Sequence, residues 1–117
     1  MEKVIDFNGG DTGLTLYMTI MRKALGTYLD ADDLTFQDPD EANPYLELEE
    51  LELDGTDSQM YEWRDDTNAW KDGQYIVTIY EQAGATPAID TDSILATATL
   101  NIHRNAIRER RYSYSGR

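Results

Sequence analysis

Three carboxylates around one acidic bend have the spacing of a calcium-binding loop. Counting from Asp30 as the first position, Asp32 is the third and Glu41 the twelfth, and all three are ligand positions in helix–loop–helix calcium sites. The fifth position is Leu34, and the sixth, where the sharp turn requires Gly, is Thr35. These three acids are therefore a weak metal candidate, and we expect a solvated acidic bend.

A second group of carboxylates, at Glu47, Glu49, Glu50 and Glu52, is close enough in sequence for paired acid and base chemistry. Alternation along a strand explains at least two of them as the solvated face and protected edge of a sheet. The chain has one His, His103, and no phosphate-binding loop, nucleophile elbow or His-Glu-x-x-His motif. The sequence therefore predicts a protein that is not an enzyme and needs no cofactor.

Arginines are concentrated at the end of the chain. Residues 101–117 hold five Arg and one acidic residue, whereas residues 1–100 hold five basic and 22 acidic residues. Guanidinium groups pair with carboxylates and phosphates, and Tyr side chains add contact area at small entropic cost. The predicted partner-binding residues are Arg104, Arg108, Arg110, Arg111, Tyr112, Tyr114 and Arg117.

We expect residues 103–117 to form a basic arm outside the folded domain. Residues 103–111 have the spacing for one or two helical turns with Arg104, Arg108 and Arg111 on one side, and residues 112–117 read as flexible. Three uses stay open for the arm: docking on the acidic body of a neighbour, contact with nucleic acid, or simple solvation. Nucleic acid contact is expected only through the arm, because the chain carries a net charge of −13.

Trp70 is the aromatic residue most expected to be exposed. It lies outside a clear strand, between Asn68 and Lys71, whereas Trp63 and Tyr75 are expected in the core. An exposed indole ring stacks on the apolar face of a sugar, so Trp70 is a candidate sugar contact.

Short segments of alternating hydrophobicity predict strands. They cover residues 14–22, 27–30, 34–37, 46–53, 59–64, 74–82 and 94–102. The segment 74–82 is apolar on both faces, which predicts the central strand. In the last segment, every second position from Ile94 to Ile102 is apolar. Leu51 and Leu53 lie on the opposite parity from Leu46 and Leu48, so a bulge near residues 49 and 50 is expected to bring all four into the core.

Turn chemistry supports an antiparallel arrangement of these strands. Asp54-Gly55 is a hairpin signal. Asp72, Gly73 and Tyr75 resemble the tyrosine corner of immunoglobulin-like domains, in which the Tyr hydroxyl bonds to the backbone. The predicted fold is an all-β, antiparallel immunoglobulin-like β-sandwich of about seven strands over residues 13–102. Residues 1–12 are expected as an N-terminal arm or edge strand, and residues 103–117 as the basic C-terminal arm.

Length and composition favour a single soluble domain. The chain has 117 residues and no Cys, so one core must hold the fold without disulfides. It contains neither an apolar run typical of a signal peptide nor one long enough for a membrane helix. We therefore expect no membrane association.

One part of the chain resembles small all-β structural proteins of tailed bacteriophages. The resemblance lies in Gly73 to Ala88 and Asp90 to Asp92, with looser matches at Tyr45 to Leu48 and Tyr61 to Trp63. It implies a virion component, assembled in the host cytoplasm, whose partners are other virion proteins of the capsid or connector and copies of itself. Capsid decoration or head stabilisation is the first expectation. The alternatives are a neck, tail or fibre-anchoring protein, or a receptor- or carbohydrate-binding module.

Overall fold

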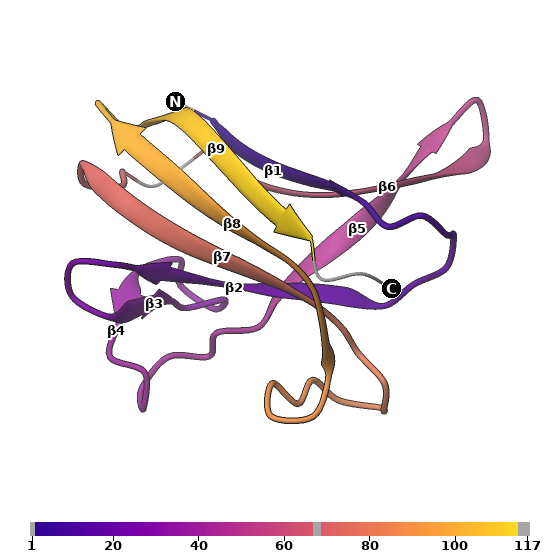
Figure 1. Cartoon of the computed structure of the whole chain (residues 1–117), viewed down its shortest axis with the longest axis horizontal. Helices are drawn as coiled ribbons and strands as arrows, with labels where there is room; N and C mark the ends of the chain where they lie inside the picture. The colour runs from indigo at the N-terminus through magenta and orange to yellow at the C-terminus, as the bar shows by residue number, and fades with distance from the viewer. Residues whose placement is uncertain (1, 67–68, 115–117) are drawn as a thin grey trace.

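The computed structural model describes residues 2–66 and 69–114, and every regular element in these ranges is a β-strand (Figure 1). The described strands are β1 (Lys3–Asn8), β2 (Leu16–Arg22), β3 (Thr27–Leu29), β4 (Phe36–Gln37), β5 (Leu46–Leu53), β6 (Thr56–Asp65), β7 (Gly73–Glu81), β8 (Ser93–His103) and β9 (Ala106–Tyr114). All seven segments predicted from hydrophobic alternation are strands, with small differences at their ends.

The strands form one antiparallel sheet. Its main path runs β1-β6-β5-β2-β7-β8-β9, with β3 paired to β2 and β4 paired to β3. β5 turns the sheet, because Leu46 and Leu48 pair with β2 whereas Glu49 pairs with β6. The result is a near-barrel (Figure 1). The all-β, antiparallel class is confirmed, but this continuous sheet does not confirm an immunoglobulin-like sandwich of two sheets.

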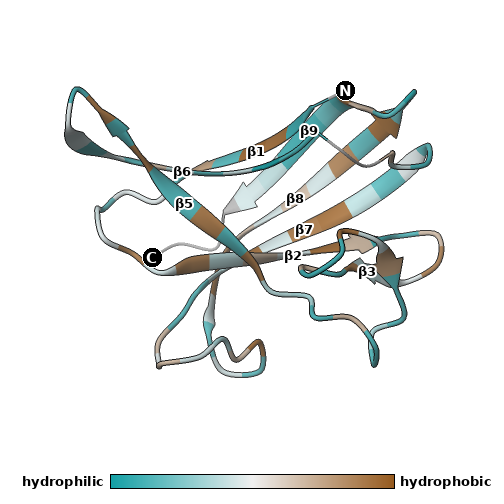
Figure 2. Cartoon of the chain, turned by 180° about the vertical axis from the view of Figure 1, so that it is seen from behind, coloured by the Kyte–Doolittle hydropathy of each residue, from teal (hydrophilic) through white to brown (hydrophobic). Residues whose placement is uncertain are grey.

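The hydrophobic core lies inside the curved sheet. Apolar and polar positions alternate along the strands (Figure 2), and the fully buried side chains include Met18, Ile20, Val77, Ile79 and Leu100. Each contributes about 1.5–3 kcal/mol relative to an exposed position. The predicted central strand is confirmed, since β7 lies between β2 and β8.

The prediction of a bulge in the Leu-rich strand β5 is wrong, because the extra residues lie on β6: Glu50 is opposite Tyr61 and Glu52 is opposite Asp57, so residue 51 faces residues 58–60. The register shifts between Glu50 and Glu52. Leu46 and Leu48 are buried, whereas Leu53 is 63% exposed. The prediction that all four Leu reach the core is wrong because the β5–β6 hairpin projects beyond the body after this register shift (Figure 1).

A bulge also interrupts the expected alternation at the start of β8. Ile79 is opposite Ala96 and Tyr80 is opposite Ile94, so Leu95 is an additional residue. Leu95 is buried, while Ile94 is 43% exposed. The prediction of one parity from Ile94 onward is therefore wrong at its first position.

The hydrogen bond expected of a tyrosine corner is present. The Tyr75 hydroxyl donates to the Lys71 carbonyl at 2.7 Å, and the Tyr75 residue is fully buried. Gly73 has φ 139°, a conformation that side chains disfavour. The corner fixes the chain that precedes β7.

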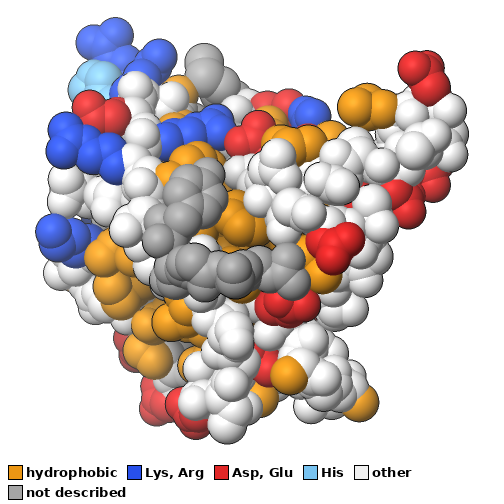
Figure 3. All heavy atoms as spheres, turned by 45° about the vertical axis from the view of Figure 1, so that its right-hand side comes forward, with side chains coloured by type: hydrophobic (Ala, Val, Ile, Leu, Met, Phe, Trp, Pro, Cys, Tyr) orange, Lys and Arg blue, Asp and Glu red, His pale blue; other side chains and the backbone are white. Residues whose placement is uncertain are grey.

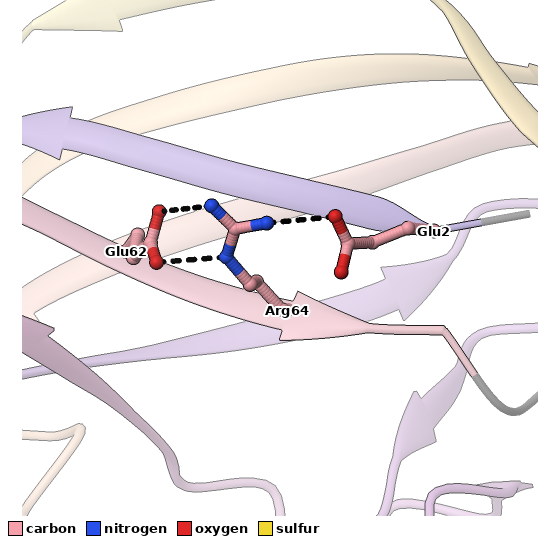
Figure 4. A network of polar contacts seen from close by, with 3 residues as sticks. All are labelled: Glu2, Glu62 and Arg64. Carbon is pink, nitrogen blue, oxygen red and sulfur yellow. Dashed lines mark hydrogen bonds and ion pairs between the residues drawn. The ribbon is translucent and has the colours of Figure 1, made fainter.

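The N-terminal segment forms an edge strand. β1 pairs with β6 from Lys3 opposite Asp65 to Asn8 opposite Met60. The Arg64 guanidinium on β6 bonds to both carboxylate oxygens of Glu62, at 2.8 and 3.1 Å, and to Glu2 at 2.7 Å (Figure 4). The bridge is solvent-accessible, so it positions the chain before β1 more than it stabilises the fold.

The C-terminal segment is not an arm over its described length. β9 pairs with β8 from Ala106 opposite His103 to Tyr114 opposite Ala96. The helical turns predicted for residues 103–111 are wrong. Without β9, the edge of β8 that faces away from β7 would have unpaired backbone N–H and C=O groups. A strand that pairs with this edge satisfies these groups and also its own backbone groups. A short isolated helix leaves the edge unpaired and is itself unstable in water.

Candidate functional site

A two-residue turn connects β8 to β9 and presents part of the Arg cluster. Its residues, Arg104 and Asn105, have φ values of 51° and 59°, and two positive φ values are typical of a type I′ hairpin turn. Asn adopts this conformation readily, whereas Arg does so at a cost. The sequence analysis missed the turn because Arg-Asn lacks the Gly that usually marks one, and Asn105 was its only signal.

Asp72 of the tyrosine corner holds this turn in place. Its carboxylate accepts the Arg104 N–H at 2.9 Å and contacts His103 Nδ1 at 3.0 Å. The Asn105 side chain accepts the Trp70 N–H at 2.8 Å. The hydrogen bond from Arg104, with a smaller effect of His103, lowers the pKa of Asp72 below its usual value. These contacts offset the strain of the turn and fix its position on the body.

Arg104, Arg108 and Arg111 are exposed on this hairpin. Ile107 is opposite Ile102 and Glu109 is opposite Asn101, so Arg108 is the extra residue of a bulge. Its Nε donates to the His103 carbonyl at 3.2 Å. Arg111 Nε donates to Glu109 at 2.9 Å while its side chain is 76% exposed. Each guanidinium has five N–H donors, so these contacts leave donors for a partner.

Charge is segregated over the surface. Lys and Arg side chains gather near the His on one side of the molecule, and Asp and Glu side chains lie along the projection on the other (Figure 3). The projection is the β5–β6 hairpin, whose exposed acids include Glu47, Glu49, Glu52, Asp54 and Asp57. We call Arg104, Arg108 and Arg111 the basic hairpin residues.

Two other predicted partner-binding residues contact β1 of their own chain. Arg110 Nη1 lies 3.5 Å from the Asp6 carboxylate, and the Tyr112 hydroxyl donates to the Asp6 carbonyl at 3.1 Å. These contacts connect the two ends of the main strand path, which brings the sheet close to closure. The side chain of Tyr114 and the whole of Arg117 lie outside the described residues.

The acidic bend uses its first carboxylate for its own backbone. Asp30 is buried, and its oxygens accept the N–H groups of Asn43, Asp32 and Asp33 at 2.7–3.0 Å. These bonds, chiefly that from Asn43, lower the pKa of Asp30. Asp32 and Glu41 are exposed. Within the described ranges, no three His, Asp or Glu side chains are placed to hold a metal ion.

Trp70 is buried, so the prediction that it is exposed is wrong. It is 3% exposed and packs against Phe36, Trp63 and Tyr75, with ring centroids 5.2–6.3 Å apart. Its Nε1 donates to Asp65 at 3.2 Å. Because the ring completes the core beneath the corner, a sugar cannot stack on it.

A buried Lys beside Trp70 was missed in the sequence. Lys3 is fully buried opposite Asp65, and its Nζ lies 5.2 Å from the centroid of the Trp70 ring. Burial lowers the pKa of Lys3, and the charge of Asp65 opposes that shift. Lys3 shares the two-residue spacing of Ile5 and Phe7, which places all three side chains on the inner face of β1. This spacing was the sequence signal that Lys3 is buried.

A buried carboxylate that organises residues 83–92 was also missed. Asp92 accepts hydrogen bonds from the Tyr17 hydroxyl at 2.7 Å, from Ala88 N–H at 2.8 Å and from Ala83 N–H at 3.0 Å. These bonds, led by that from Ala83, lower the pKa of Asp92. Burial and the Asp92 contact raise the pKa of Tyr17. In the Tyr17–Asp92 pair, the proton therefore stays on the Tyr17 hydroxyl. The hydrogen bonds of Asp92 hold the loop of residues 83–92 in place, and we call Asp92 the loop support.

Comparison of the chain with protein-family models, curated proteins and solved structures found no match. In the described part of the chain, no helix has the length and apolar character to cross a membrane.

Proposed function

We propose that this chain is a non-enzymatic structural protein of a tailed bacteriophage virion, of immunoglobulin-like type, which decorates or stabilises the capsid. The proposal draws its place in the virion from the sequence resemblance over residues 12–102. It draws its mode of action from the basic hairpin residues, which are exposed on a chain whose remaining surface is strongly acidic.

The observation that carries this mode of action is the fixed position of the basic hairpin. Asp72 and Asn105 bind the turn to the body, so Arg104, Arg108 and Arg111 project from a rigid sheet and not from a flexible tether. A rigid surface loses less conformational entropy on binding than a disordered arm. The proposed attachment to a partner therefore uses a preformed surface of the domain, and not the flexible basic arm expected from the sequence.

A neighbouring copy or another acidic virion protein would suit this surface. Arg pairs bidentately with carboxylates, and the β5–β6 hairpin presents exposed acids on the opposite side of the same molecule. A contact between different surfaces of adjacent copies is heterologous, and such contacts build rings or extended arrays. Repeated contacts of this kind fit a protein that covers a shell.

Two measurements test the proposal. The first is quantitative mass spectrometry of purified phage particles: a copy number close to that of the main shell protein would support decoration. A few copies per particle would instead favour a neck, tail or fibre position, and absence from the particle would refute a virion role.

The second measurement tests the basic hairpin itself. Replacing Arg104, Arg108 and Arg111 together by Glu should abolish incorporation into particles, because the new charges repel acidic partners. The matched control replaces the same three residues by Lys, which keeps the charge and should keep most of the incorporation. Equal incorporation of both folded variants would show that the hairpin is not the attachment surface.

A further inference from the structure

A groove lies beside the tyrosine corner, and none of the basic hairpin residues lines it. It has a volume of about 300 Å³ and is bordered by β2, β3, β4 and the chain that leads into β7. Its wall includes Phe36 and Tyr75, and Leu25 at its rim is 66% exposed. The volume is at the lower end of the range for small-ligand sites, and it fits a group about the size of one large amino acid.

Two polar atoms in the groove wall lack partners. Arg22 on β2 and Thr27 on β3 are opposite each other in the antiparallel register and both line the groove. Arg22 Nε and Thr27 Oγ1 are covered, and neither has a hydrogen-bond partner among the described residues. Unsatisfied buried polar atoms are rare and costly, so a neighbouring pair of them requires an explanation.

Other Arg residues of the chain show how unusual Arg22 is. Arg64 Nε pairs with Glu62 (Figure 4), Arg108 Nε with a carbonyl and Arg111 Nε with Glu109. The chain holds 23 acidic residues, and yet none lies among the described residues that line this groove. Arg22 and Lys71, by contrast, give the lining two cationic side chains.

We propose that the groove binds a carboxylate attached to an apolar group the size of a single Leu or Phe side chain. The carboxylate meets the Arg22 guanidinium and the Thr27 hydroxyl, supplying the acceptor that both lack. The apolar group lies against Phe36 and Leu25. Because Arg22 Nε and Thr27 Oγ1 are both covered in the free protein, both side chains turn toward the groove on binding.

The same chemistry occurs in a free organic acid and in the C-terminal residue of a peptide. A phosphate or sugar lacks the apolar part that Phe36 and Leu25 would cover, and a neutral apolar compound leaves Arg22 without an acceptor. The inference does not depend on a place in the virion.

The test is an NMR titration of the ¹⁵N-labelled full chain with 3-phenylpropionate and with N-acetyl-leucine. Both should give saturable shifts at amides of residues 22–27 and 34–36. N-acetyl-leucine amide, which lacks the carboxylate, and acetate, which lacks the apolar group, should bind about tenfold more weakly or worse. Equal binding of the amide, or no saturable shift with either acid, would overturn the proposal.

Variants and peptides complete the experiment. Arg22→Met should weaken the binding of N-acetyl-leucine by about ten- to a hundredfold, whereas the neighbouring exposed control Lys23→Met should not change it. Spectral dispersion of each variant reports whether it is folded, and a folded Arg22→Met with unchanged affinity would refute the role of Arg22. A short peptide ending in Leu is compared with its amidated form: carboxylate-dependent peptide binding identifies a chain terminus as a source, and binding of the free acids alone identifies a small molecule.

Discussion

Removal of one hydroxyl group tests the tyrosine corner that positions both the basic hairpin and the groove. In Tyr75→Phe, the ring stays in a fully buried position, and only the 2.7 Å hydrogen bond to the Lys71 carbonyl is lost. A bond of this kind contributes about 1–2 kcal/mol, including the cost of a carbonyl left with a poorer partner. We therefore expect the free energy of unfolding to fall by about 1–2 kcal/mol at pH about 7, measured by urea denaturation.

The same variant should change the dependence of stability on pH. Burial raises the pKa of Tyr75 above its ordinary value of 10.0, so the folded state keeps the proton after the unfolded state has released it. The hydroxyl's stabilisation is thus fully present below pH about 10 and declines as the pH rises toward the folded pKa. Above pH about 10, ionisation of Tyr75 in the unfolded chain therefore lowers the stability of the wild type but not that of the Phe variant.

The stability gap between the two proteins should therefore narrow as the pH rises above about 10. Tyr17, Tyr61 and Tyr80 also have raised pKa values, but they titrate in both proteins and their effects cancel. Tyr45→Phe is the control, because Tyr45 is only half-buried and its hydroxyl has no hydrogen-bond partner within the described ranges; it should cost less than about 0.5 kcal/mol. A Tyr75→Phe variant as stable as this control at neutral pH, or a gap that does not narrow at high pH, would refute the reasoning.

Two further predictions concern the loop support and the projecting β5–β6 hairpin. The pKa of Asp92 is lowered in the folded protein, so the contribution of Asp92 to stability is present above pH about 4 and is lost as the pH falls through the folded pKa. In Asp92→Asn, the melting temperature should therefore fall less steeply with decreasing pH than in the wild type. The exposed control Asp90→Asn should keep the steep fall of the wild type. Leu48→Ala should lower the free energy of unfolding by about 2–4 kcal/mol, whereas Leu53→Ala should lower it by less than about 0.5 kcal/mol, as measured by urea denaturation. Equal losses at the two Leu positions would mean that the projecting hairpin also packs on the core.

Local chemistry made most of the strands predictable. The alternation in Leu16 to Ile20, and the apolar run from Tyr75 to Tyr80, reflect the two-residue period of strand side chains, which a sequence displays directly. Asp54-Gly55 likewise predicts its hairpin, because both residues accept the positive φ values of 54° and 76° that they adopt. The sequence could not show where bulges shift the parity, as at Leu95, because a bulge depends on the partner strand.

The candidate site was predicted by residue type but not by arrangement. The concentration of Arg near the C-terminus is visible in the sequence, and Arg104, Arg108 and Arg111 are exposed together. Whether that segment is an arm or a strand depended on the edge of β8, which exists only in the folded sheet. The groove beside the corner gave no sequence signal, since Arg22 and Thr27 meet through strand pairing and approach Lys71 only through the fold.

The amino-acid sequence alone determined the all-β class, the central strand, the corner at Tyr75 and the separation of acidic from basic residues. These follow from side-chain period, turn preferences and charge, which act between near neighbours in the chain. Only the tertiary structure decided that Trp70 is covered, that β9 closes toward β1 through Asp6, and that Arg22 Nε lies at a groove without a partner among the described residues. Those outcomes depend on which distant segments exclude water from one another, and that is a property of the assembled sheet.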